Sequence, residues 1–167
     1  MAKKQEKTLE DLFEDGLKDI YFAEKKILQG LKKMAKAAES AESVTAFENH
    51  YAETETQIER LEQVFELLEK KPAGKKCPAI LGILEEGDEI AKEYKGSPAL
   101  DAGLIAAAQA VEHYEMSRYG ALKAWAKELG MKEAVRLLDQ TLSEEIKTDK
   151  LLTTMAEGQA NQRAEAA

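Results

Sequence analysis

Four segments of the chain repeat apolar residues at alternating steps of three and four, the spacing that places side chains on one face of an α-helix. In the first segment these residues are Phe13, Leu17, Ile20, Ile27, Leu31 and Met34. Thr8, with Asp11 three residues later, can cap this helix in a variant of the capping box. Pro72 and Gly74 end the second segment, and Gly130 separates the third from the fourth. Four such stripes predict a helical bundle.

The breaks between the apolar stripes predict where each helix begins and ends. The predicted helices span about 8–37, 43–68, 79–94, 99–129 and 132–157. Ser43 is expected to cap the second helix, and residues 158–167 lack apolar spacing and are expected to fray. One long connection, Lys75–Pro98, joins two helix pairs and carries the short third helix. This layout predicts an all-α, ferritin-like four-helix bundle with a long crossover, as a single domain over 1–167 with its core at about 8–157.

Charge and composition restrict the class of protein. The net charge of -8 leaves no basic face for non-specific binding of nucleic acid. Met1–Lys4 is followed by no apolar run, so neither a signal peptide nor a membrane anchor is expected. No stretch is apolar for long enough to span a bilayer. The single cysteine, Cys77, permits no internal disulfide, and we therefore expect a soluble protein of the cytoplasm.

Polar residues interrupt each apolar stripe about midway along its helix. They are Glu24 in the first long helix, His50 with Glu53 at the stripe's edge in the second, Glu112 and Glu115 in the third, and Glu145 and Asp149 in the fourth. Burying an isolated carboxylate costs several kcal/mol, and several at one level also repel one another. A pair of cations offsets that repulsion, and hard oxygen ligands match iron or manganese. These seven residues are the predicted ligands of a di-iron or manganese centre.

The usual di-metal carboxylate pattern takes a Glu from each of two helices and a Glu-x-x-His from each of the other two. Glu24 and Glu112 fit the single-Glu positions, and Glu145 fits a third, with Glu144 as the alternative. The sequence contains no Glu-x-x-His. Its second helix has the reverse order, with His50 before Glu53, which still places the two side chains on neighbouring turns. A metal-free, hydrogen-bonded polar layer is the alternative interpretation of the same residues.

Several segments together resemble a known family. They are Asp19–Glu24, His50–Glu62, Ala107–Glu115 and Glu144–Glu145 with Thr148–Asp149, of which Ala107–Glu115 is the most specific. These segments are similar to the ferritin-like stress proteins of the YciE/YciF type found in bacteria. The resemblance implies a ferritin-like bundle, homodimerisation, a di-metal site and a link to stress responses. It brings no settled reaction, because the biochemical activity of that family is itself obscure.

Two functions follow as expectations. The first is a stress-related di-iron or iron–manganese protein that reacts with oxygen or peroxide, or handles iron. The second is a metal-free helical homodimer that acts as a protein-interaction module. No phosphate-binding loop, nucleophile triad or closed zinc set is present in the sequence, so nucleotide binders and hydrolases are not expected. Partners are expected to be protein rather than nucleic acid or membrane.

Overall fold

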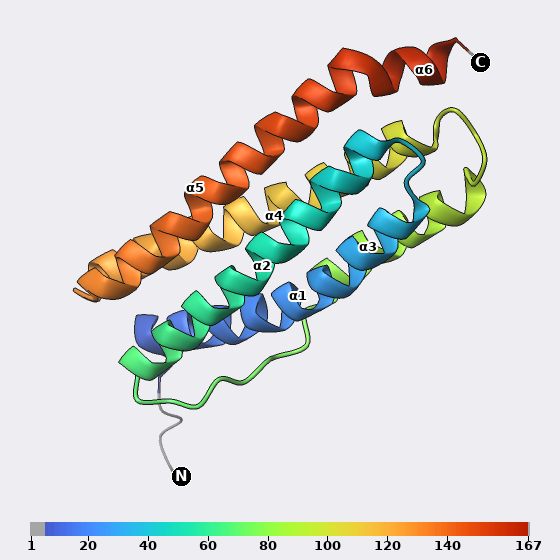
Figure 1. Cartoon of the computed structure of the whole chain (residues 1–167). Helices are drawn as coiled ribbons and strands as arrows, with labels where there is room; N and C mark the ends of the chain where they lie inside the picture. Colours follow the sequence, from blue (N-terminus) through green and yellow to red (C-terminus); the bar gives the residue numbers. More distant parts are fainter. Residues whose placement is uncertain (1–5, 167) are drawn as a thin grey trace.

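The computed structural model describes residues 6–166, which form an elongated bundle of helices (Figure 1). Over that range the long helices are α1 (Leu9–Ala37), α2 (Ala41–Leu67), α4 (Leu100–Glu128) and α5 (Lys132–Met155). The shorter helix α3 (Pro78–Glu93) lies in the connection between α2 and α4. The predicted all-α fold with a short fifth helix is therefore confirmed. Met1–Lys4, where the sequence predicted no targeting segment, lies outside the described residues.

The four long helices form a closed ring. Helix α1 packs on α2, α2 on α5, α5 on α4, and α4 on α1, while α3 covers the seam between α1 and α4 from outside. The segment after α2 returns along α1, where the Lys75 amide donates to the Lys18 carbonyl at 3.0 Å. As a result α2 and α4 run in the same direction, as the colours of Figure 1 show. This is the ferritin-type connection that the long crossover predicted.

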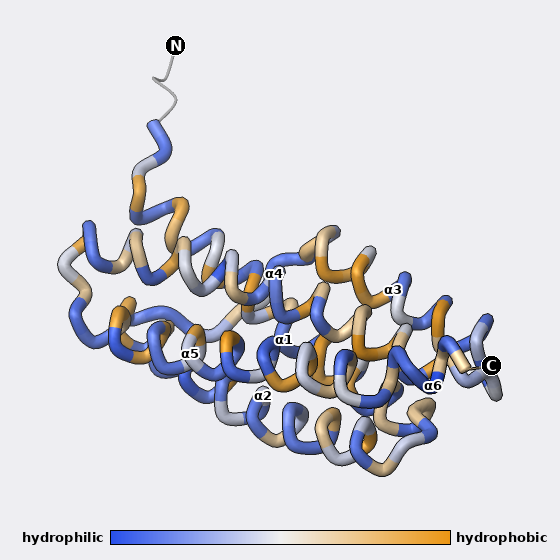
Figure 2. The backbone as a smooth tube through the Cα atoms, turned by 90° about the horizontal axis from the view of Figure 1, so that it is seen from above, coloured by the Kyte–Doolittle hydropathy of each residue, from blue (hydrophilic) through white to orange (hydrophobic). Residues whose placement is uncertain are grey.

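Hydrophobic burial along the bundle axis holds these helices together. Figure 2 shows apolar and polar residues alternating along each helix, as expected for amphipathic helices. Leu17, Leu61, Leu104 and Leu138 lie on the inner faces of the four long helices and are at most 1% exposed. None of the helices within 6–166 is both long and apolar enough to cross a membrane. The core is therefore a bundle interior, within which any buried polar residue needs an explanation.

Two glycines let α3 lie close to the ring. A Cβ atom at Gly30 in α1 would come within 2.7 Å of a Leu84 methyl, and one at Gly103 in α4 within 2.7 Å of an Ile90 methyl. Both separations are below van der Waals contact, so α3 can approach the α1–α4 seam only where side chains are missing. The apolar face of the crossover helix is covered in this way.

The structure differs from the sequence prediction in two places, and the first is the N-cap of α2. Ser40, not Ser43, is the N-cap, and its hydroxyl accepts from the Ser43 amide at 3.1 Å. The buried Asp101 carboxylate accepts from the amides of Glu39 and Ser40 at 2.9 and 2.8 Å. These bonds between α4 and the α1–α2 turn fix the chain so that the helix begins three residues early, and Ser43 lies buried in its first turn.

The tail also differs from the prediction of fraying. Helix α5 continues into a π-helical turn, Ala156–Ala160, and then a short helix α6, Asn161–Glu165. Ala160 is only 3% exposed, and this segment packs against α4. A small residue can be buried there without the apolar periodicity that sequence reasoning looks for. The wider π turn brings Ala160 onto the bundle.

Candidate metal centre

Five polar side chains from all four long helices meet inside the bundle. Glu24, Glu112, Glu115 and Glu145 are each 0% exposed, and His50 is 4% exposed. Each occupies an inward position of the buried stripe of its helix, so the packing of neighbouring turns carries it into the interior. Charged groups are almost never buried this fully unless they are paired or bind a metal. The predicted convergence of these five residues is observed.

His50 lies between carboxylates from two other helices. Its Nδ1 atom is 3.0 Å from Glu112 Oε1, and its Nε2 atom is 3.4 Å from Glu145 Oε2. His50, Glu112, Glu115 and Glu145 each offer one ligand atom, and these four atoms lie within 4.8 Å of one another. Nitrogen and oxygen donors from α2, α4 and α5 thus surround a common point, which is the arrangement that a bound cation requires.

Most donor atoms of this group make no hydrogen bond. Among the described residues, both carboxylate oxygens of Glu112, Glu115 and Glu145, one oxygen of Glu24 and the Nε2 atom of His50 have no hydrogen-bond partner. The two close approaches of His50 therefore lack hydrogen-bond geometry. Leaving a buried polar atom unpaired costs about 1–3 kcal/mol, and more when the group is charged. In the metal-free, hydrogen-bonded layer, the alternative interpretation of the sequence, these atoms would need partners that this arrangement does not give them.

Burial and crowding change the acid–base behaviour of the group. Burial and the nearby Glu145 carboxylate raise the pKa of Glu24 to about 8. Burial also raises the pKa values of Glu112 and Glu115 well above the ordinary range. Burial alone would lower the pKa of His50, but the Glu112 and Glu145 carboxylates outweigh it and raise that pKa well above its usual value. The group therefore holds protons tightly. A cation that displaced these protons would neutralise the carboxylates in their place.

Tyr119 completes the Glu24 end of the group. Its ring is fully buried, and its hydroxyl donates a hydrogen bond to Glu24 Oε1. The charge of Glu24 also contributes to the raised pKa of Glu115, so these two carboxyls are close neighbours. Burial, followed by the Glu24 charge, raises the pKa of Tyr119 well above its ordinary value, so the phenol stays a hydrogen-bond donor. Glu24 is thereby held by one oxygen, and its other oxygen is free to bind.

The structure distinguishes Glu145 from its neighbour Glu144. Arg60 donates to both Glu144 oxygens, from Nη1 at 2.5 Å and from Nη2 at 2.7 Å. Gln57 donates to the same carboxylate at 3.2 Å. Glu144 is thus engaged in a two-pronged ion pair at the α2–α5 seam, whereas Glu145 is 0% exposed and faces His50. Of the two alternatives, only Glu145 lies in the group.

Two predicted ligands lie at or beyond the edge of the group. Glu53 is half-buried at the α2–α5 seam, where the Thr148 hydroxyl donates to it at 3.5 Å. Asp149 Oδ1 accepts from Gln109 Nε2 at 3.2 Å and lies 3.1 Å from His113 Nε2. His113 is exposed, so this contact is on the outer side of the α4–α5 seam. The structure therefore does not bring Asp149 together with the other predicted ligands, and it leaves Glu53 at the rim.

Sequence reasoning did not predict the hydrogen bonds that the residues around the group make with other helices. Tyr119, Arg60 and Gln57 each bond to an acidic residue on another helix. Tyr119 and Gln57 occupy inward positions of their stripes, and that placement was the available signal. Which acidic residue each one meets depends on the register between helices, which a single sequence does not give.

The donor set fits a pair of hard or borderline cations. Four carboxylates carry four negative charges when ionised, which two divalent ions neutralise, and His50 adds one imidazole nitrogen. Oxygen-rich sites with imidazole suit iron and manganese, and the group contains no thiolate that would favour softer metals. The unpaired buried atoms are those that such ions would engage. The residues present therefore fit a dinuclear centre.

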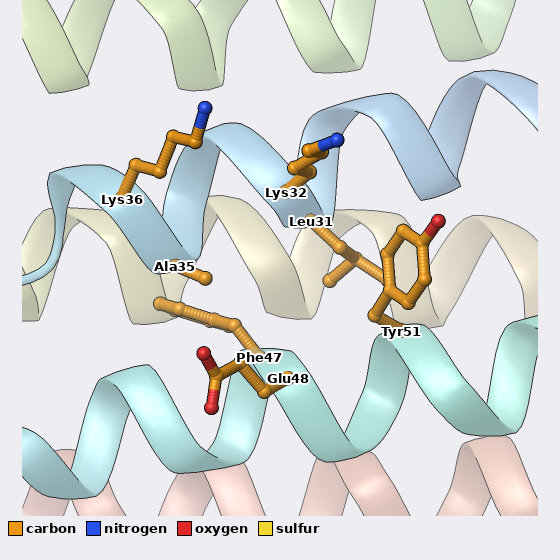
Figure 3. A pocket seen from close by; sticks show the side chains of 7 residues that line it. All are labelled: Leu31, Lys32, Ala35, Lys36, Phe47, Glu48 and Tyr51. Carbon is orange, nitrogen blue, oxygen red and sulfur yellow. The ribbon is translucent and has the colours of Figure 1, made fainter.

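A surface groove between α1 and α2 is a separate feature. It has a volume of about 400 Å³ and lies between α1 and α2, with Lys32 and Lys36 on one side and Glu48 on the other (Figure 3). Leu31, Ala35, Phe47 and Tyr51 line the rest of it. None of these lining residues belongs to the buried polar group, so the groove is not a mouth of the candidate metal centre.

Comparison with known proteins places the chain among bacterial relatives. It is 43% identical to protein YciF of Escherichia coli over 160 residues, which cover 95% of this chain and 96% of the relative. The crystal structure of that E. coli stress protein matches with a TM-score of 0.89 at 43% identity, over 93% of this chain and 99% of the other. The structure of YcfI from Rhodopseudomonas palustris matches with a TM-score of 0.86 at 46% identity, over 92% and 98%.

A third solved structure, protein XCC3681 of Xanthomonas campestris, shares the fold at 23% identity with a TM-score of 0.73, over 95% of this chain and 96% of the other. Residues 8–165 match the family described as a domain of unknown function, DUF892. The resemblance to YciF-type proteins that the sequence motifs indicated is thus confirmed over nearly the whole chain. The chain belongs to the DUF892 family.

Proposed function

We propose that this protein is a stress-related, ferritin-like protein that holds two iron or manganese ions among its four long helices. The observation that carries the proposal is the set of buried donor atoms without hydrogen-bond partners, contributed by Glu24, Glu112, Glu115, Glu145 and His50. Such a set is costly without cations and is what a carboxylate-rich dinuclear site requires. The stress link rests on the similarity to the E. coli stress protein YciF.

Each part of the group has a distinct task in this proposal. His50, Glu112, Glu115 and Glu145 would hold one end of the centre, and Glu24 with Glu115 the other. When bound, iron or manganese supplies exchange between two oxidation states and open positions for an oxygen ligand. The side chains around the group keep bulk water out, since Ile20, Ile27 and Leu61 on adjoining turns are at most 1% exposed. Tyr119 keeps a proton at Glu24 Oε1 and orients that carboxylate.

The chemistry that fits is reaction with oxygen or peroxide, or the handling of iron. Carboxylate ligands stabilise the higher oxidation state, and the single imidazole leaves the site harder than one built on several histidines. We further propose that the protein works in the cytoplasm as a homodimer. A metal-free dimer that serves as an interaction module would retain the fold but not use the buried group.

Anaerobic loading with ferrous iron, followed by oxygen or hydrogen peroxide, tests the proposal. We expect iron to be oxidised faster with the protein than in matched buffer, with absorbance rising in the near ultraviolet. Asp149→Asn is the matched control, since Asp149 lies outside the group and this variant should oxidise iron as the wild type does. Oxidation no faster than in protein-free buffer would contradict a role in oxygen or peroxide chemistry.

A further inference from the structure

Gln57 has a buried side-chain amide whose nitrogen makes a hydrogen bond and whose oxygen makes none. Its side chain lies on the inward face of α2 and is 0% exposed. The Nε2 atom donates to Glu144 Oε2 at 3.2 Å. The Oε1 atom is buried and accepts no hydrogen bond from any residue of 6–166. A neutral oxygen acceptor is therefore available in the bundle interior that the proposed function has not used.

The orientation of this amide is determined by its neighbour. Arg60 donates to both oxygens of Glu144 and so fixes the position of that carboxylate. Both Glu144 oxygens act as acceptors in these bonds, and Gln57 presents its NH₂ group to Oε2. The carbonyl oxygen then points away from Glu144. The Arg60–Glu144 ion pair thus acts as a clamp that aims one end of the amide.

Register between the helices places Gln57 at the Glu24 end of the metal centre. On α5, its partner Glu144 adjoins Glu145. On α1, the Tyr21 hydroxyl donates to Glu62 of α2 at 2.8 Å, and in an antiparallel pair this contact puts Glu24 within about one helical turn of Gln57. His50 lies about two turns away on the same face of α2. Gln57 and His50 therefore serve opposite ends of the centre.

We propose that Gln57 Oε1 is a neutral oxygen ligand of the metal ion nearest Glu24. The inference rests on the proposed function, because it adds a ligand to the same dinuclear centre. Amide carbonyl oxygens bind hard cations, and a neutral ligand adds no charge to a group that four carboxylates already balance against two divalent ions. The usual pattern supplies two histidines, one from a Glu-x-x-His on each of two helices, whereas this chain has no Glu-x-x-His and only His50 in the described group. His50 then serves the first ion and Gln57 the second.

Titration of the metal-free protein with manganese(II), with free ion measured by electron paramagnetic resonance, separates the two binding steps. For Gln57→Leu we expect the first ion to bind with wild-type affinity and the second to bind about tenfold or more weakly. Gln57→Asn keeps an amide but withdraws its oxygen by one methylene, and the same selective loss is expected. Gln109→Leu is the matched control, since Gln109 also bridges two helices, through Asp149 and Thr153, away from the centre.

The outcomes distinguish the ligand from the centre itself. Selective weakening of the second step in both Gln57 variants, with Gln109→Leu unchanged, supports the assignment. If both Gln57 variants bind two ions as tightly as the wild type does, the assignment of Gln57 as a ligand is overturned and the dinuclear centre remains in place. Equal weakening of both steps also overturns it, since that marks a general structural role. A wild-type protein that binds no manganese or ferrous iron overturns both the ligand and the proposed function.

Discussion

Replacing Glu112 with alanine is expected to lower the bound metal by more than tenfold while leaving the helical content nearly unchanged. Glu112 faces His50 at 3.0 Å and belongs to the group of donors that lie within 4.8 Å of one another. Removing it takes away a charged ligand, but alanine is the best helix former and removes a source of repulsion from the interior. Elemental analysis of the purified variant, with far-ultraviolet circular dichroism, measures both effects.

Asp149→Asn is the control for this experiment. The sequence predicted Asp149 as a ligand, whereas the structure places it against Gln109 and His113. This variant should therefore keep the wild-type metal content. Loss of metal from Asp149→Asn, or full retention by Glu112→Ala, would contradict the arrangement of donors described above.

The metal-free protein is expected to lose stability as the pH rises from about 5 to 8. Burial and Glu145 raise the pKa of Glu24 from 4.5 to about 8, so within that window the folded state holds a proton that the unfolded state releases. Stability falls with pH wherever the folded state binds more protons. The raised pKa of His50 acts in the same direction above pH 6.5. In a chain of this size each kcal/mol lost lowers Tm by roughly 2–4 °C.

Thermal unfolding of chelator-treated protein across this pH range measures the effect. In Glu115→Gln the dependence on pH should be weaker, because burial raises the pKa of Glu115 too and the variant removes one titrating group. Added manganese(II) should reverse the trend, since metal binding needs deprotonated ligands and strengthens as the pH rises. Metal-free stability that increases between pH 5 and 8 would be incompatible with these protonated carboxyls.

The order and spans of the long helices follow from local signals in the sequence. The Thr8–Asp11 capping box forms as predicted, with the Asp11 amide donating to the Thr8 hydroxyl at 3.2 Å. Apolar spacing gives the helices, and the length of the crossover gives the ferritin-type connection. The cap of α2 was not predictable, because Asp101 of α4, 61 residues further along the chain, accepts from the Ser40 amide and fixes Ser40 as the cap.

Whether a polar residue faces the interior depends on its angular position around the helix axis, and small differences in that angle decide which predicted ligands join the site. Glu145 and Asp149 are four residues apart and so differ by about 40° around the axis. That rotation turns Asp149 from the interior toward Gln109 of α4. Glu53 is three residues past His50, about 60° away, and faces Thr148 of α5. Spacing alone assigned Asp149 to the stripe and Glu53 to its edge.

The hydrogen bonds and ion pairs between side chains of different helices could not be predicted from the sequence. The spacing of residues in one helix does not say that Arg60 meets Glu144 or that Tyr119 meets Glu24, since both contacts depend on the register between helices. The inward residues could therefore be predicted one helix at a time. Their hydrogen bonds, and the amide that Gln57 leaves unpaired, required the packed bundle.

Metal stoichiometry tests the central claim most directly. The protein would be purified without metal-affinity steps and measured by elemental analysis before and after anaerobic addition of ferrous iron. We predict about two iron or manganese ions per chain in at least the second sample, as expected for a dinuclear carboxylate centre. No bound metal in either sample would contradict the claim and would make Glu24, Glu112, Glu115 and Glu145 a structural polar layer of the bundle.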